Sequence, residues 1–254
     1  MPIAMKPYLS VIISAFNEEE NYNRGVLDEV LKYLSSQKFT WEIILVNDGS
    51  SDNTSELLHK FSSQRSQVQV IDNPHMGKAL GIITGALKAR GEIVMFTDMD
   101  QATPIDETGK MLDKINQGYD IVIGSRTGRK GAPLFRQILA VGNIILRTLI
   151  LRLPFKDTQC GFKAFRGEAA HKIFTIMDKL RPRVVISGPA VDPGFDVELL
   201  YLGRKLGYKI VEVPVTWQYK ESRRVRFVYD AISGLYGLLI VRWRSLAGSY
   251  KYVT

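Results

Sequence analysis

Short apolar runs alternate with amphipathic segments through the first half of the chain. Runs rich in valine, isoleucine and leucine are typical of strands buried in a parallel sheet, and the segments between them repeat apolar residues at helical spacing. Strands that alternate with helices through short loops predict an α/β fold with a mostly parallel, Rossmann-like doubly wound sheet. The predicted strands cover 9–16, 41–46, 68–71, 93–98 and 121–126, and the clearest helices cover 21–36, 79–89 and 106–116.

Two long apolar segments in the second half have a different character. The segment 134–152 is apolar around most of a helix, and 227–243 repeats apolar residues at helical spacing, with aromatic residues and arginines near its end. One interpretation is an ordinary pair of core helices. The other is a pair of amphipathic helices in a membrane interface, with their apolar faces down and basic and aromatic residues at the headgroups.

The distribution of charge favours the interface interpretation. The formal net charge is +8, and residues 220–254 hold seven lysines and arginines against two acids. An anionic leaflet attracts each such cation by about 1 kcal/mol. No uncharged stretch reaches the about 18 apolar residues of a spanning helix, so no membrane span is expected. The sequence therefore predicts a main domain over 1–220, which includes the helix at 134–152, and a basic membrane-associating helix within 221–254.

Two aspartates come at the end of the fourth predicted strand. Asp98 and Asp100 are separated by one residue, so their carboxylates point the same way in an extended chain. Ligands of open α/β sheets bind just past the carboxyl ends of the strands. Two adjacent anions repel each other unless a cation lies between them, which favours a divalent ion, Mg²⁺ or Mn²⁺, completed by phosphate oxygens. The alternative is a solvated turn, where aspartate is common.

Polar residues also follow the other predicted strands. Asn17 and Glu18 come after the first strand, Asp48 after the second, and Arg126 ends the fifth. Because these ends meet at one edge of a parallel sheet, they predict a shared crevice. The sequence has no Gly-x-Gly-x-x-Gly after the first strand and no P-loop, which disfavours redox dinucleotide and P-loop nucleotide binding. One cysteine and three scattered histidines exclude an internal disulfide and disfavour a zinc site.

The order of these motifs resembles glycosyltransferase family 2 over about residues 8–220. The segment 158–163 and the Ala-Thr-Pro after the aspartate pair are most similar to polyprenyl-phosphate hexosyltransferases, in the glucosyl branch more than the mannosyl branch. The resemblance implies a GT-A type nucleotide-sugar-binding fold. It also implies inverting transfer of a hexose, glucose from UDP-glucose, to a polyprenyl or dolichyl phosphate. The segments that carry the resemblance are 15–18, 46–52, 77–78, 98–100, 124–126, 158–163 and 195–198.

The resemblance also implies roles for the residues of the crevice. Asp98 would contact the ribose and the metal ion, and Asp100 would bind the ion that bridges the diphosphate. Mannosyl relatives carry a glutamine two residues after the second aspartate as a further metal ligand. Here that position is Ala102, with Gln101 beside it. The nucleoside is expected at Ala15, Asn17, Glu18 and Asp48, with Asp48 reading the base and Lys78 near the nucleotide.

A phosphate acceptor is already anionic at neutral pH, so it needs cations for positioning rather than a strong general base. Arg126 and Arg136 are the main candidates for this work. Arg223 and Arg224 are further candidates, with solvated surface charge as the alternative. The residues expected to orient the sugar or the acceptor are Gln159, Lys163, Asp196 and Glu198.

Other functions remain open from the sequence alone. The donor could be another nucleotide-sugar such as GDP-mannose, and a soluble acceptor would require a base, for which Asp196 or Glu198 is the source. A basic membrane- or nucleic-acid-binding module is the non-enzymatic alternative. Acids line the crevice where a polyanion would bind, so no nucleic-acid partner is expected. The expected location is peripheral, on the cytosolic face of a membrane, and homo-oligomerisation is left open.

Overall fold

The computed structural model describes residues 6–127, 134–188, 192, 194–218 and 227–250. Within them, seven strands form one sheet in the order β3-β2-β1-β4-β6-β5-β7, and β6 alone runs antiparallel to its neighbours. The predicted mostly parallel α/β sheet is confirmed. The strands are β1 Leu9–Ala15, β2 Trp41–Asp48, β3 Val68–Asn73, β4 Ile93–Asp98, β5 Ile121–Thr127, β6 Lys163–Arg166 and β7 Ile210–Thr216.

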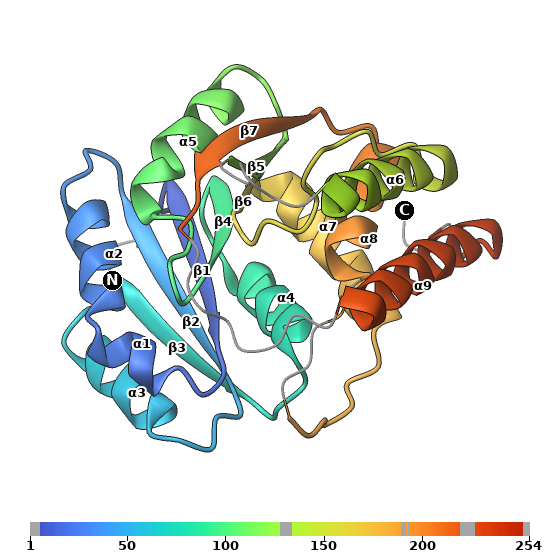
Figure 1. Cartoon of the computed structure of the whole chain (residues 1–254). Coiled ribbons are helices and arrows are strands. Elements are labelled where there is room, and N and C mark those ends of the chain that lie inside the picture. The colour runs from blue at the N-terminus through green and yellow to red at the C-terminus, as the bar shows by residue number, and fades with distance from the viewer. Residues whose placement is uncertain (1–5, 128–133, 189–191, 193, 219–226, 251–254) are drawn as a thin grey trace.

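Helices cover both faces of the sheet (Figure 1). Because side chains alternate along a strand, Val11 faces one layer and Ile12 the other. The layer at Val11 is closed by α2 (Val26–Ser35), α3 (Thr54–Ser63) and α5 (Thr108–Asn116). The layer at Ile12 is closed by α4 (Lys78–Lys88), α7 (Gly167–Leu180) and α8 (Phe195–Lys205). Both faces are therefore buried, as the apolar strands predicted.

The helix expected over 21–36 is interrupted. The structure has α1 at Glu19–Asn23 and α2 from Val26, with Gly25 between them at φ 80°. Glycine adopts this left-handed conformation without a steric cost, so it ends one helix before the next begins. A 3-10 turn, η1 (Ile105–Glu107), likewise precedes α5, where one continuous helix was expected.

The antiparallel strand β6 has the largest consequence for the site. It lies between β4 and β5, and its first residue, Lys163, pairs with Phe96 near the end of β4. An antiparallel strand begins where its neighbour ends, so the segment before β6 reaches the carboxyl end of β4. The residues 158–162 are thereby brought against the aspartate pair, although about 60 residues separate them in sequence.

The two long apolar helices, α6 (Leu134–Leu151) and α9 (Phe227–Leu246), lie near each other at one end of the molecule (Figure 1). Each buries some of its described apolar side chains, at Leu151, Leu238 and Val241, and exposes others. No helix in the described part of the chain is both long and apolar enough to cross a membrane. The predicted boundary at 220 lies outside the described residues. The exposed apolar residues are Val141, Ile145, Leu146, Leu149, Leu235, Tyr236, Leu239, Trp243 and Leu246.

Candidate functional site

The carboxyl ends of three adjacent strands bring the predicted donor residues to one edge. Ala15 ends β1 and pairs with Asn47, the residue before Asp48, while Ser14 pairs with Asp98 at the end of β4. This is the edge where ligands of doubly wound sheets bind. The predicted meeting of these strand ends in one crevice agrees with the register of the sheet.

Cationic side chains lie close to the carboxylate of Asp98. Its carboxylate forms an ion pair with Lys78, the first residue of α4. Burial acts to raise the pKa of Asp98, but the charge and hydrogen bond of Lys78, with the charges of Lys163 and Arg126, outweigh it and lower the pKa. Asp98 is therefore held ionised. Lys78 was expected near the nucleotide, and the structure places it against this carboxylate.

A second acid, Glu18, shares this end of the sheet. Burial raises the pKa of the Glu18 carboxyl, a hydrogen bond from Asn21 opposes the rise, and the charges of Asp100 and Asp98 add to it. The charges of both aspartates therefore act on Glu18, and the charge of Lys78 partly offsets them. A cation placed between the two aspartates would relieve this repulsion.

The two aspartates fit a divalent ion that takes most of its ligands from elsewhere. Among the residues that the structure describes, no cluster of three or more acids, histidines or cysteines has the geometry to hold a metal by itself. Mg²⁺ and similar ions are commonly held by one or two carboxylates plus substrate phosphates. Asp100 Oδ1 also accepts the backbone N–H of Ala102 at 2.9 Å, which fixes its direction.

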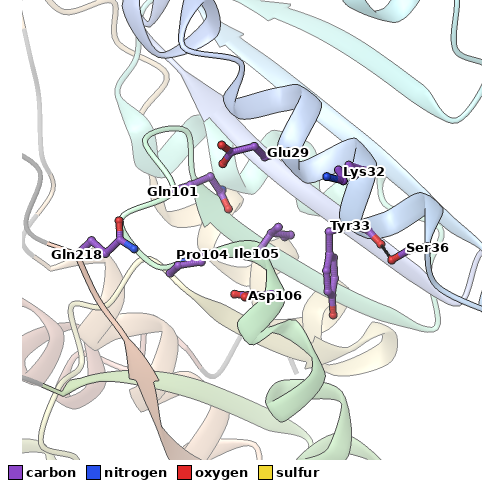
Figure 2. Close-up of a pocket in the computed structure, with 9 residues that line it drawn as sticks. All are labelled: Glu29, Lys32, Tyr33, Ser36, Gln101, Pro104, Ile105, Asp106 and Gln218. Atoms are coloured by element: carbon purple, nitrogen blue, oxygen red, sulfur yellow. Dashed lines mark hydrogen bonds between the residues drawn. The ribbon is translucent and has the colours of Figure 1, made fainter.

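Gln101 folds its side chain back onto the residues that lead into the aspartate pair. It adopts φ 49°, and its amide donates to Thr97 Oγ1 at 3.2 Å and to the Asp98 carbonyl at 2.8 Å. Its side chain lines a cavity of about 580 Å³ on the α2 side of the loop, together with Tyr33 and Asp106 (Figure 2). The amide nitrogen of Gln101 is thus engaged, whereas its Oε1 is buried without a hydrogen-bond partner among the described residues.

Gly161 approaches Asp98 very closely. A Cβ added at Gly161 would lie 2.5 Å from Asp98 Cγ and closer still to both carboxylate oxygens. Any side chain at this position would displace the Asp98 carboxylate. The segment before β6 therefore forms one wall around Asp98.

Asp48 is almost fully buried, with 1% of its surface exposed. Its carboxylate accepts the backbone N–H groups of Met76 at 2.9 Å and Gly77 at 2.8 Å, and pairs with His75 Nδ1 at 2.8 Å. Asp48 thus fixes the loop that begins α4 and carries Lys78. Its predicted contact with a base stays a prediction.

His75 was not singled out from the sequence, but it joins three parts of the site. Its ring stacks on Phe16, with centroids 3.8 Å apart, and its Nε2 lies 2.9 Å from the Gly188 carbonyl. Burial acts to lower the pKa of His75, and its hydrogen bonds to Gly188 and Asp48 outweigh this and raise the pKa. A lone histidine in a loop gives no pattern by which the sequence could have indicated this role.

Asn17 links the loops after β1 and β2. It adopts φ 54°, and its Oδ1 accepts the backbone N–H of Ser51 at 2.8 Å. Asparagine tolerates this left-handed conformation better than most residues. The structure thus places Asn17 beside Ser51, on the rim where the nucleoside was expected.

Arg126 has a partner that the sequence did not suggest. Its Nε lies 2.6 Å and its Nη2 2.9 Å from the two oxygens of Asp157, which makes a bidentate pair. Its guanidinium also lies 5.7 Å from the Trp217 ring centroid. Such a pair fixes the plane of the guanidinium. Arg126 is near enough to Asp98 for its charge to act on that carboxylate.

Lys163 is completely buried. Its Nζ lies 2.5 Å from the Cys160 carbonyl and 2.5 Å from Asp196 Oδ1, and 5.4 Å from the Phe96 ring centroid. Lys163 was expected to orient the sugar or the acceptor. Because its ammonium group is buried against these partners, Lys163 is placed to affect the sugar or the acceptor through Asp196 and the segment before β6.

The remaining predicted residues are not all brought to the crevice. Glu198 is 1% exposed and forms ion pairs with Arg181 and Arg244, away from Asp98. Gln159 is exposed in the loop before β6, and its backbone N–H donates to Asp157 at 3.2 Å. The side chain of Arg136 lies outside the described residues, as do Arg223 and Arg224 entirely.

Comparison with known proteins identifies the family. The model of glycosyl transferase family 2 matches residues 10–174. The chain belongs to glycosyltransferase family 2. It is 37% identical over 235 residues to the dolichyl-phosphate beta-glucosyltransferase ALG5A of Trichomonas vaginalis, which covers 86% of this chain and 68% of that protein. It is 30% identical over 262 residues to the human dolichyl-phosphate beta-glucosyltransferase. That alignment covers 96% of this chain and 77% of the human protein.

Solved structures agree with this family on the fold. Glucosyl-3-phosphoglycerate synthase from Mycobacterium tuberculosis, in complex with Mn²⁺, UDP-glucose and phosphoglyceric acid, superposes with a TM-score of 0.61 at 16% identity, covering 93% of this chain and 80% of that one. Mannosyl-3-phosphoglycerate synthase from Rubrobacter xylanophilus superposes with a TM-score of 0.66 at 14% identity. The superposition covers 95% of this chain and 75% of the synthase. The predicted GT-A fold is confirmed, and the family 2 chain is a glycosyltransferase.

Proposed function

We propose that this glycosyltransferase moves glucose from UDP-glucose to dolichyl or another polyprenyl phosphate, with inversion, at a membrane surface. The observation that carries the proposal is that relatives matching 86% and 96% of the chain are dolichyl-phosphate beta-glucosyltransferases. The site supports it, because acids for a metal–diphosphate complex and a fixed arginine occur at one sheet edge. The donor residues in this proposal are Ala15, Asn17, Glu18, Asp48, Lys78 and Asp98.

Asp98 and Asp100 would hold a divalent ion, Mg²⁺ or Mn²⁺, together with the donor diphosphate. The ion would neutralise the charge that grows on the leaving nucleoside diphosphate. The ion pair with Lys78 keeps Asp98 ionised, and Ala102 fixes the direction of Asp100. Two carboxylates give a weak site, so we expect the ion to bind tightly only when the diphosphate is present.

The acceptor step requires positioning more than proton transfer. A lipid phosphate carries its own negative charge, so its oxygen can attack the anomeric carbon without a strong base. Arg126, fixed by Asp157, supplies a cation whose guanidinium plane is set before the acceptor arrives. Asp196 is already paired with the buried Lys163, which supports orientation of the sugar rather than proton abstraction.

The exposed apolar side of α6 and α9, defined by the nine residues given above and called here the apolar face, supports a lipid partner. Soluble proteins rarely expose large contiguous apolar areas without a binding function. The exposed Arg242 lies within the last turns of α9, next to the exposed Trp243, as in helices that lie in a membrane interface. Peripheral attachment on the cytosolic side, with 221–254 as the attaching segment, belongs to the same proposal.

Gly161→Ala tests the wall around Asp98. The added methyl group must displace the carboxylate, and crowding of this kind costs about 1–3 kcal/mol. We expect the Kd of UDP with Mn²⁺ to rise at least about tenfold, measured by calorimetry. Gly109→Ala is the matched control, because a Cβ there has no neighbour within 4 Å. Equal binding by both variants would contradict the close contact.

Trp243→Glu tests the apolar face. The side chain is 66% exposed, so the change should leave folding intact while it places a charge where acyl chains would contact the helix. We expect binding to vesicles containing anionic lipid to fall at least about tenfold, measured by sedimentation. Val185→Glu provides a control of equal exposure outside α6 and α9. If both variants sediment with vesicles like the wild type, the apolar face does not bind lipid.

The function itself is tested by transfer from a panel of nucleotide-sugars to polyprenyl phosphate in the presence of Mg²⁺ or Mn²⁺. The proposal requires glucose transfer from UDP-glucose to the lipid. Transfer from GDP-mannose instead would show that the proposed donor is wrong. Transfer only to a soluble sugar would show that the proposed acceptor is wrong, and a base would then be required, for which Asp196 is the candidate. Binding to oligonucleotides without any transfer would favour the non-enzymatic alternative.

A further inference from the structure

Two acids in the first turn of α8 point in different directions. Asp196 and Glu198 are two residues apart, which corresponds to about 200° around a helix. Asp196 accordingly meets Lys163 at 2.5 Å, near Asp98 and Lys78, while Glu198 meets a separate group of residues. One helical turn therefore contacts the donor site on one side and a different part of the molecule on the other.

Glu198 contacts two parts of the chain that are far apart in sequence, the end of α7 and the region of α9 with the residues just after it. Its Oε2 lies 2.7 Å from Arg181 Nη1, directly after α7, and its Oε1 lies 2.8 Å from Arg244 Nη1 in α9. The same Oε1 accepts the Tyr250 hydroxyl at 2.7 Å. A carboxylate that is 1% exposed is costly to bury unless cations and hydrogen-bond donors surround it, as Arg181, Arg244 and Tyr250 do here. Both regions are thereby held to α8.

These contacts place Glu198 between the donor site and the apolar face. Arg244 comes directly after Trp243, which is 66% exposed on that face. A further hydrogen bond joins Tyr201 of α8 to Ser245 of α9 at 2.5 Å, and a Cβ at Gly194 would lie 3.6 Å from the Gly237 Cα. The start of α8 therefore packs directly on the helix that carries the apolar face.

We infer that Glu198 is a positioning residue, which fixes α9 and its apolar face relative to the donor site so that a membrane-bound acceptor phosphate reaches the sugar. This inference rests on the proposed transfer to a lipid phosphate. Glu198 itself touches neither the sugar nor the phosphate. Its loss should therefore affect use of the lipid acceptor and leave binding of the nucleotide unchanged.

Glu198→Gln removes the charge but keeps the size of the side chain. We expect the KM for polyprenyl phosphate in vesicles to rise about tenfold, because small displacements far from the chemistry misplace a reacting group. The Kd of UDP with Mn²⁺ should stay within about twofold, since Asp98 and Lys78 are untouched. Amide hydrogen exchange in 235–246 should become faster relative to α2.

Glu42→Gln is the matched control. Glu42 is 6% exposed and accepts hydrogen bonds from Arg90 and Ser10, but it lies near the start of β2, at the edge opposite the site. Both variants should lose stability, and only Glu198→Gln should raise the acceptor KM. If the two variants raise it equally, Glu198 has a general structural role and the inference falls. It also falls if Glu198→Gln weakens UDP binding as much as acceptor use.

A double variant tests whether Glu198 acts through its contact with Arg244. If Glu198 acts through Arg244, then Arg244→Met should raise the KM similarly, and combining it with Glu198→Gln should add little. Additive effects would contradict a shared contact.

If the wild type transfers no glucose to the lipid, the proposed function fails, but the positioning of α9 is still decided by hydrogen exchange. Equal exchange in the wild type and Glu198→Gln would overturn it.

Discussion

Asp100→Ala should reduce metal-dependent transfer at least about 100-fold, the scale on which a lost stabiliser of leaving-group charge acts. The reason is that Asp98 divides its carboxylate between the ion and Lys78, so the ion depends on Asp100. Within the described residues no third acid, histidine or cysteine has the geometry to replace it. Initial rates at increasing Mn²⁺ would measure the loss, and excess metal should restore little activity.

Two further variants show whether the loss comes from the ion or from the loop. Asp100→Asn keeps an oxygen that can accept the Ala102 N–H, so the turn should persist while the metal site loses a charge. It should be nearly as inactive as Asp100→Ala. Asp106→Ala removes an exposed acid from the same loop region and should leave rates within about twofold of the wild type. Substantial transfer by Asp100→Ala would refute the assignment of Asp100 to the metal.

The parallel strands and the aspartate pair could be predicted because they depend on local sequence. Buried parallel strands are apolar runs, and the residue after each run must lie at the carboxyl edge. The antiparallel strand β6 could not be predicted in the same way. It has four residues, two of them cationic, and Lys163 is buried only because Asp196 compensates its charge. That compensation comes from a residue 33 positions away.

Long-range pairs account for most of what the sequence did not indicate. Arg126 was predicted as a phosphate-binding cation, but its partner Asp157 is 31 residues away and follows a different element.

The different positions of Asp196 and Glu198 could have been predicted from the sequence alone. Once 195–205 is taken as a helix, Asp196 and Glu198 must diverge by about 200°, so one site cannot easily receive both. Helical spacing was the available signal.

Lys163→Met should both destabilise the protein and reduce transfer. The change leaves Asp196, which is 23% exposed, without its cation, and breaking a buried pair from one side costs about 3 kcal/mol. For a chain of this size we expect Tm to fall by about 10 °C in calorimetry. Burial acts to lower the pKa of Lys78, but Asp98, Asp196 and Asp100 together raise it, so Lys78 already senses Asp196. Without Lys163, Asp196 competes with Asp98 for Lys78.

The double variant Lys163→Met with Asp196→Leu separates stability from catalysis. Replacing both members of a buried pair with apolar residues is often neutral for stability, so Tm should recover most of its loss. Transfer should stay at least about tenfold below the wild type, because the first turn of α8 then presents no carboxylate to the site. Recovery of both properties would show that the pair serves the fold alone. Recovery of Tm without transfer would place Asp196 in the orientation of the sugar, with Lys163 as the buried cation that holds it there.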